Sequence, residues 1–276
     1  MRGKAIAWGL SACGLAFVAS CTGADPVFPP EDAGAGADGG PVGSRCKNTV
    51  SAPGAAFHFD ACEVEVGAGD VAGNWKDRVT GKSAIGDAVY DPTGAGVQPA
   101  VKFTNSRYVF AHASANDVAN GSFALVVVGR YSASSSGRLG AYFASKTNGA
   151  DVPVGALLYG KFFVNDSDGT TGVGAQLKFG EKYAHVAADQ SDKLLVMTMW
   201  RTSTALAFRL NGVEAATTPV AASDAFDSQG KEWTFGGGLQ DERNLAGVIA
   251  EIILVKEPAA GVVEKLEADL KARYAL

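Results

Sequence analysis

The chain of 276 residues carries a formal net charge of −5, with 47% hydrophobic and 19% charged residues. This is the composition of a globular protein, and the length suffices for one large domain or two small ones. The acidic balance argues against a nucleic-acid partner, because binding to phosphate needs a basic surface. Four cysteines in a chain of this length exclude a small domain built mainly on disulfides.

The first 20 residues have the pattern of an export signal. Arg2 and Lys4 precede an apolar run from Ala5 to Ala19, which ends in small residues. This run is too short to span a bilayer comfortably as a mature helix. We therefore expect residues 1–20 to be a signal peptide.

The end of this signal resembles the lipobox of bacterial lipoproteins. In Val18-Ala19-Ser20-Cys21 the resemblance implies that Cys21 is lipidated and becomes the first mature residue. Several acyl chains on one residue give stable membrane anchoring. Thr22, rather than Asp, follows the cysteine, which resembles the signature for passage to the outer membrane. We expect an exported protein anchored at the cell envelope; the alternative is that Cys21 is an incidental thiol beside an ordinary cleavage site.

Residues 21–45 are rich in Gly, Ala, Pro and Asp, and they predict a disordered tether between the anchor and a domain over 46–276. Two cysteines stand at the entrance of that domain, Cys46 and Cys62. In an exported chain we expect them to form a disulfide. A metal site is the alternative, but only His58 lies between them and the short spacing of paired metal ligands is missing.

Short apolar runs separated by Gly, Asn, Asp and Ser predict one all-β domain. The run 123–128 is β-branched and bounded by Gly121 and Gly129; the others cover 154–164, 194–200 and 248–255. Regular short strands with turn signals favour a sandwich or barrel over alternating strands and helices.

A hairpin and a helix follow from local patterns near the C-terminus. Leu206, Phe208 and Leu210 alternate along one strand, and Asn211-Gly212 then predicts a tight turn, since both residues tolerate positive φ. The apolar residues of the last segment recur at spacings of three and four, which predicts an amphipathic helix that docks on the sandwich. They are Val263, Leu266, Leu270 and Tyr274.

Five phrases resemble, in the same order, those of bacterial concanavalin A-like, laminin-G-like jelly-roll domains. They are the segments 74–82, 98–103, 210–212, 235–238 through 247–253, and 264–276, which begin with Asn74-Trp75-Lys76-Asp77 and end with the helix that carries Leu270 and Tyr274. The resemblance covers about residues 55–276. It implies an all-β, two-sheet antiparallel jelly-roll sandwich with a C-terminal amphipathic helix.

Some members of this superfamily are glucanases, and a glucanase site would require a pair of carboxylates. A retaining glycosidase needs two carboxyl groups about 5–5.5 Å apart. Glu63 and Glu65 point the same way on an extended chain but lack the central Asp of the glucanase phrase, and Glu251 and Glu257 are separated by an apolar run. We therefore expect no catalytic residue and no enzymatic activity.

Metal and cofactor sites are also weakly indicated. Asp166 and Asp168 beside a turn glycine are suitable calcium ligands, but the acidic residue that closes an EF-hand loop is missing. A hydrated turn is the alternative, and we expect no cofactor. His58, His112 and His185 lack metal-type spacing and are expected to be structural or surface residues.

Aromatic residues are the remaining candidates for a sugar site, because sugar rings stack on them. The proposed ligand-binding residues are Trp200, Arg201, Trp233, Tyr142 and Tyr159; a place in the core is the alternative for large aromatic side chains. The sequence thus favours a surface-anchored, non-catalytic recognition module that binds a polysaccharide or an envelope protein. A structural or assembly lipoprotein and an atypical glycoside hydrolase remain as alternatives.

Overall fold

The computed structural model describes residues 49–104, 106–111, 121–133, 139–145, 156–165, 170–177, 182–221, 224, 232–237 and 245–276. All of them belong to one unit, Gly40–Leu276. The strands are β1 Ala55–Asp60, β2 Asn74–Lys76, β3 Ser83–Gly86, β4 Val89–Ala95, β5 Gln98–Thr104, β6 Tyr108–Ala111, β7 Phe123–Tyr131, β8 Leu139–Ser145, β9 Ala156–Asn165, β10 Thr170–Leu177, β11 Lys182–Val186, β12 Leu195–Arg201, β13 Ala205–Leu210, β14 Val213–Pro219, β15 Glu232–Phe235 and β16 Ala246–Lys256. A 3₁₀ turn, η2, covers Ala61–Glu63, and the helix α3 covers Val262–Tyr274.

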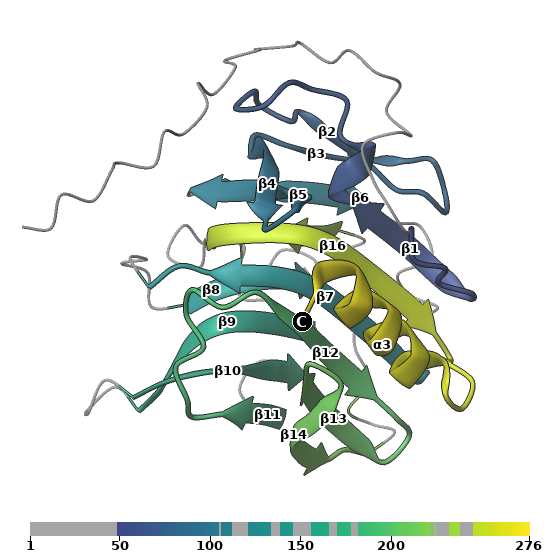
Figure 1. Ribbon diagram of the computed structural model, residues 1–276. Helices are drawn as coiled ribbons and strands as arrows, with labels where there is room; N and C mark the ends of the chain where they lie inside the picture. The colour runs from purple at the N-terminus through teal and green to yellow at the C-terminus, as the bar shows by residue number, and fades with distance from the viewer. Residues whose placement is uncertain are drawn as a thin grey trace, which may run out of the picture. The chain divides into compact units, whose positions relative to one another are not determined.

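The strands form two eight-stranded sheets, and every named strand pair is antiparallel. Sheet A has the order β14-β13-β12-β7-β16-β5-β4, with β1 added beside β16. Sheet B has the order β11-β10-β9-β8-β15-β6-β3-β2. Neighbours in these sheets are often far apart in the sequence, so the chain crosses repeatedly between the two layers (Figure 1). The predicted two-sheet antiparallel sandwich is confirmed.

The side chains of β7 alternate between two apolar clusters, one on each face of sheet A. Leu125 and Val127 belong to the core between the sheets, whereas Val126 and Val128 belong to a second apolar cluster on the outer face of sheet A. A strand with both faces covered must be apolar throughout, which explains the continuous run in the sequence. The inner core is rich in edge-to-face aromatic pairs, such as Phe59 with Phe110 at 4.8 Å between ring centroids.

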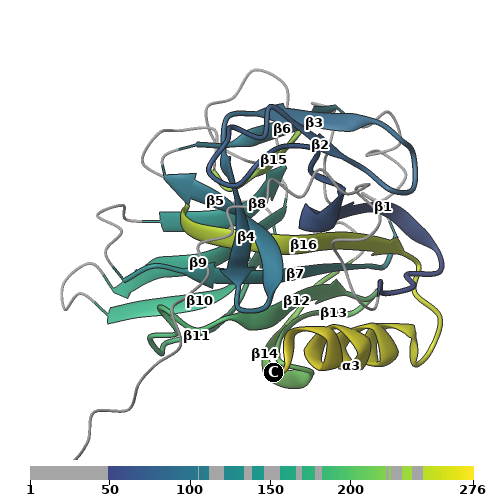
Figure 2. The same ribbon diagram turned by 45° about the horizontal axis from the view of Figure 1, so that its top comes forward.

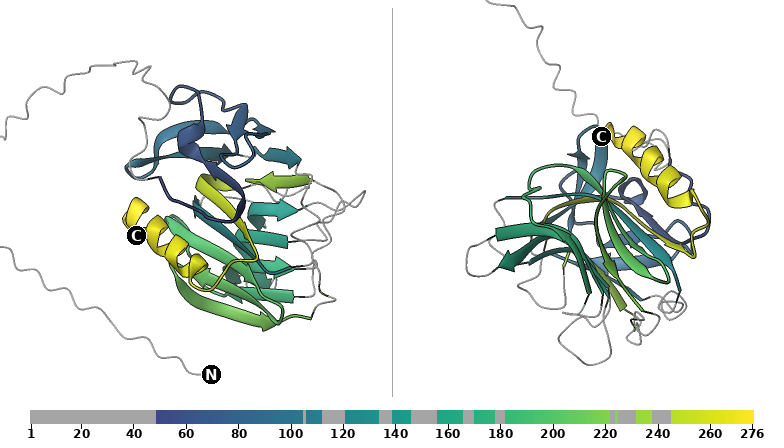
Figure 3. Two further views of the ribbon diagram at one scale, coloured as in Figure 1. Left: turned by 90° about the vertical axis from the view of Figure 1, so that its right-hand side faces the viewer. Right: turned by 90° about the horizontal axis from the view of Figure 1, so that it is seen from below.

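The second cluster is covered by α3. Leu266, Leu270 and Tyr274 pack on the outer face of sheet A with Val126, Val128 and Ile253. Figure 3 shows the helix lying outside the two layers. It contacts β12 and β7, and the predicted amphipathic helix is confirmed. Within the described ranges, no helix has the length and apolar character that crossing a membrane requires.

The predicted hairpin turn is also confirmed. Asn211 and Gly212 have φ of 49° and 82°, and they connect β13 to β14. The Asn211 side chain adds a contact that the sequence did not suggest, because its Oδ1 accepts a hydrogen bond from the Val196 N–H at 2.9 Å. The turn is therefore tied to the adjacent strand β12.

Replacement of Gly236 should be costly. Gly236 has φ of +73°, and a Cβ at this position would overlap the buried ring of Phe103. Gly236→Ala should lower the free energy of unfolding by about 2–4 kcal/mol, because left-handed strain adds to overpacking. Gly81→Ala is the control, since Gly81 has φ of +72° with open space around its Cβ. Urea unfolding of both variants checks the prediction; equal losses would contradict the overpacking argument.

Candidate functional site

A bulge in β16 turns the carboxylate of Glu251 out of the core. Ile249 pairs with Gly129, but Glu251 pairs with Val128, so Ala250 is an extra residue in the strand. Without it, Glu251 would share the core-facing side of Ile249. The bulge stands where β16 changes its partner on one edge from β5 to β1.

Glu251 thereby enters a buried ionic group that we call the Arg273 cluster: His58, Asp60, Glu251, Arg273 and Tyr274. Arg273 Nη1 lies 2.8 Å from Asp60 Oδ2 and 3.0 Å from Glu251 Oε2, and its Nη2 lies 3.1 Å from Asp60 Oδ1. His58 Nε2 lies 2.7 Å from Glu251 Oε1, and Tyr274 Oη donates to Glu251 Oε2 at 2.9 Å. All five residues are buried. The cluster therefore joins β1, β16 and the end of α3.

The electrostatics fix the protonation of two members of this cluster, Tyr274 and Arg273. Burial, followed by the charge of Glu251, raises the pKa of Tyr274 well above its ordinary value, so the hydroxyl stays protonated and can donate. Burial lowers the pKa of Arg273, but the charges of Glu251 and Asp60 outweigh it and the net direction is upward. The guanidinium thus stays charged opposite two carboxylates.

The same geometry decides what the cluster can do chemically. His58, Asp60 and Glu251 have potential ligand atoms within 4.8 Å of one another, a spacing that a metal ion could bridge. However, the Arg273 guanidinium already lies between the two carboxylates at hydrogen-bond distance. The set therefore fits a fixed ion-pair network better than a cation site or an accessible acid–base pair.

The Trp75–Asp77 phrase that carried the family resemblance is structural. Trp75 Nε1 donates to the Asp60 carbonyl at 2.9 Å. Asp77 accepts hydrogen bonds from the backbone N–H groups of His58 at 2.7 Å and Thr80 at 3.0 Å. These contacts fix the turn after β2 against β1, so the phrase supports the framework beneath the Arg273 cluster.

Four of the five residues proposed from the sequence to bind a ligand are buried. Trp233, Tyr142 and Tyr159 are at most 1% exposed, and Arg201 is 2% exposed. Burial raises the pKa of Tyr142 and Tyr159 and lowers that of Arg201. The Arg201 guanidinium donates to the Gly121 carbonyl at 2.8 Å. These side chains therefore lie within the protein and present no exposed ring to a ligand.

Trp200 is the exception, because it is only partly buried on the outer side of sheet A. The Arg209 guanidinium lies 5.7 Å from the centre of its ring. Arg209 in turn donates from Nε and Nη2 to the Glu267 carboxylate of α3 at 2.9 Å each. Trp200 thus takes part in a stack that fastens α3 to sheet A, and its ligand role stays a prediction.

The other sequence candidates are dispersed. Glu63 Oε1 lies 3.5 Å from Arg78 Nε, and Glu65 is exposed beyond the 3₁₀ turn η2. Cys62 is buried, with Arg273 Nη2 at 3.0 Å from its Sγ. Its pairing with Cys46 stays a prediction, since Cys46 lies outside the described residues, as do Cys21, Asp166, Asp168 and His112.

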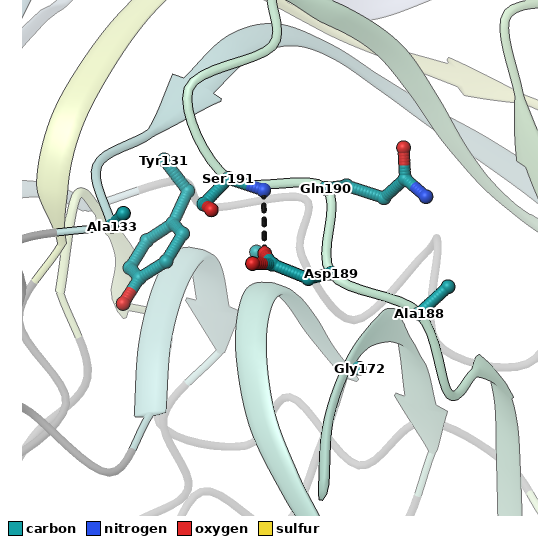
Figure 4. Close-up of a pocket in the computed structure, with 8 residues that line it drawn as sticks. Tyr131, Ala133, Gly172, Ala188, Asp189, Gln190 and Ser191 are labelled. Atoms are coloured by element: carbon teal, nitrogen blue, oxygen red, sulfur yellow. Dashed lines mark hydrogen bonds between the residues drawn. The ribbon is translucent and has the colours of Figure 1, made fainter. Parts of the chain in front are cut away.

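The described residues do form an open polar pocket, lined by the end of β7 from sheet A and by β9 and β10 from sheet B. We call it the mouth pocket; its volume is about 210 Å³ and it is lined by Tyr131, Ala133, Gly160, Gly172, Ala188, Asp189, Gln190 and Ser191. Figure 4 shows the Tyr131 ring and the Asp189 carboxylate on one side, while the Gln190 side chain extends the other way. Asp189 Oδ1 accepts from the Ser191 N–H at 2.8 Å and shapes the loop. Sequence reasoning missed this site because it joins β7, β9, β10 and the loop before β12.

No family model matches the sequence, and comparison with curated proteins gave no match. Solved structures do share the fold. The botulinum neurotoxin serotype C1 binding domain has a TM-score of 0.56 at 14% identity, over 79% of this chain and 52% of that chain. Trypanosoma rangeli sialidase has a TM-score of 0.51 at 14% identity, over 84% of this chain and 35% of that one.

A further botulinum neurotoxin type C structure, described by the toxin's dependence on two ganglioside molecules for cell entry, has a TM-score of 0.55 at 13% identity. It matches 79% of this chain and 51% of its own length. The chain therefore spans about half of the toxin domains and about a third of the sialidase. At this level of identity the likeness is one of fold, a β-sandwich of the jelly-roll type.

Proposed function

We propose that this protein is a non-catalytic recognition module that binds glycan in the mouth pocket while a lipid on Cys21 holds it at the cell envelope. The observation that carries the proposal is the pocket itself. It brings the Asp189 carboxylate, the Gln190 amide and the Ser191 hydroxyl together beside the largely buried Tyr131 ring, around a small open volume. These are the groups that recognise a sugar, which offers hydroxyls along its edge and C–H groups on its faces.

The glycines of the mouth pocket support this assignment. Gly160 lies on β9, and a Cβ there would come within 2.9 Å of Tyr131 Cβ and 2.5 Å of the Tyr142 ring. Any side chain at this position would push into the aromatic wall of the pocket. Gly160 thus keeps this part of the pocket wall free of a side chain and the pocket volume open.

The proposed lack of catalytic activity is based on the burial and the ion pairs of two acidic residues in the described part of the chain. Asp60 and Glu251 are close to one another, but both are fully buried and bound to Arg273. A glycosidase needs one carboxyl group to give up a proton to substrate and a second to attack or activate water, both at an accessible cleft. The fixed ion pairs of the Arg273 cluster leave neither group available.

Glycan binding is expected to depend on the open volume of the mouth pocket, and filling it should abolish retention. Ala133 is an exposed residue that lines the pocket, so Ala133→Phe should block entry without disturbing the core. Retention on a glycan array and affinity for the best-retained neutral oligosaccharide should fall at least tenfold.

Ala187→Phe is the matched control, because Ala187 is exposed near the same loop but does not line the pocket. This variant should bind within twofold of the parent. Absence of retention on any glycan would overturn the proposed function. Equal binding by Ala133→Phe and the parent would place the glycan site elsewhere and remove the observation on which the proposal depends.

A further inference from the structure

A second pocket lies on the outer face of sheet A, at the end that carries β5, β16 and β7. Strand register places two rows of residues side by side. Lys102 pairs with Val248, and Val248 pairs with Arg130. In the next row, Thr104 pairs with Ala246, whose carbonyl accepts a hydrogen bond from the Ser132 N–H at 2.8 Å. Val248 and Ala246 of β16 thus form the middle of the two rows. A cation and a hydroxyl residue lie on each side of them, Lys102 with Thr104 on β5 and Arg130 with Ser132 at β7.

These residues line a cavity of about 450 Å³, which we call the row pocket. It is separate from the mouth pocket, because the two have no lining residue in common. Figure 2 shows β4 curving across β16 near this end of sheet A. The Arg130 guanidinium reaches that strand, where its Nη2 donates to the Gly94 carbonyl at 3.1 Å. One hydrogen bond therefore orients the guanidinium and uses only one of its five N–H groups.

The charges of the row pocket are two cations and one carboxylate. Lys102 is exposed and forms no ion pair within the described part of the chain, whereas Arg130 is half-buried. Asp192 stands at the rim with φ of 60°, and its Oδ1 accepts from the Ala133 N–H at 3.3 Å. Because β16 lies between their strands, the backbones at Lys102 and Arg130 are two strand spacings apart, about 10 Å, and the two long side chains can approach one small anion from opposite sides.

We propose that the row pocket binds a carboxylate-bearing sugar, of the uronic acid class. The carboxylate lies between Lys102 and Arg130, with Arg130 contributing the geometry suited to a carboxylate. Sugar hydroxyls meet Thr104 and the Asp192 carboxylate, and the C–H face of the ring lies on Val248. This inference rests on the proposed glycan-binding function, but it assigns a different site and a narrower ligand class.

The test uses the whole domain and a panel of galacturonate, glucuronate, guluronate and mannuronate oligosaccharides, with affinities measured by calorimetry at low salt. At least one member should bind, and its methyl ester should bind at least tenfold more weakly because the ring is kept and the charge removed. Lys102→Met and Arg130→Gln should each weaken binding at least tenfold. Lys76→Met is the control, since Lys76 is an exposed lysine on sheet B, and it should stay within twofold.

Each failure has a defined meaning. No binding to any panel member, equal binding of the methyl ester, or an equal loss in Lys76→Met would overturn the uronate site. A separate variant distinguishes failure of the proposed glycan site in the mouth pocket from failure of the uronate site. Ala133→Phe should leave uronate affinity within twofold, whereas Lys102→Met should leave retention of neutral glycans unchanged.

Discussion

Arg273→Met should lower the free energy of unfolding by about 3–5 kcal/mol, the typical cost of removing one partner from a buried ion pair. Methionine fills much of the volume of the arginine stem, so the loss is electrostatic more than steric. It leaves the buried Glu251 carboxylate without the cation that now lies 3.0 Å away, and it removes the guanidinium 2.8 Å from Asp60, which keeps Arg78 Nη1 at 3.2 Å. The end of α3 would also lose its polar connection to β1 and β16. Urea unfolding followed by tryptophan fluorescence measures the effect.

Lys265→Met on the same helix is the matched control. Lys265 forms an exposed pair with Asp269, one helical turn away, and such pairs contribute only about 0.3–0.5 kcal/mol. A second variant tests the mechanism: Asp60→Asn combined with Glu251→Gln in the Arg273→Met background should recover part of the loss, because no buried charge is left unpaired. A loss below 1 kcal/mol in Arg273→Met would show that the carboxylates find water or another partner.

The fold could be predicted because its signals are local. The alternation of Leu206, Phe208 and Leu210 and the turn at Asn211-Gly212 are readable within seven residues, and β13 and its turn agree with this prediction. Gly129 was different. It was interpreted as the end of a strand, but β7 continues to Tyr131, and a Cβ at Gly129 would lie 2.6 Å from the Tyr142 ring. This glycine is required by a residue of the other sheet, which no local pattern reveals.

The candidate sites could not be predicted because they, too, depend on contacts between residues that are far apart in the sequence. Lys102 and Arg130 are separated by 28 positions in the sequence, and they share a row only because β16, near the end of the chain, lies between their strands. The bulge at Ala250 decides which face Glu251 occupies, and nothing in the surrounding apolar run marks it. Large aromatic residues such as Trp233 were candidates by chemical type, but cross-sheet packing places them in the core.

Cys21→Ala should release the protein from the membrane, which is the largest effect we expect on localisation. Two or more acyl chains give stable anchoring, and among the described residues no helix is long and apolar enough to replace them. In detergent phase separation the parent should enter the detergent phase and the variant the aqueous phase, or remain as an uncleaved precursor. Mass spectrometry of the parent should find the acyl groups on Cys21 as the first mature residue.

Cys13→Ala is the control for this experiment, because Cys13 lies in the predicted signal and would leave with it. It should be lipidated and fractionate as the parent does. The position after the cysteine separates anchoring from destination: Thr22→Asp should keep the lipid but hold the protein in the inner membrane if the resemblance to the outer-membrane signature is functional. An unacylated mature parent would remove the anchor, and the sandwich would then have to meet its glycans as a secreted domain.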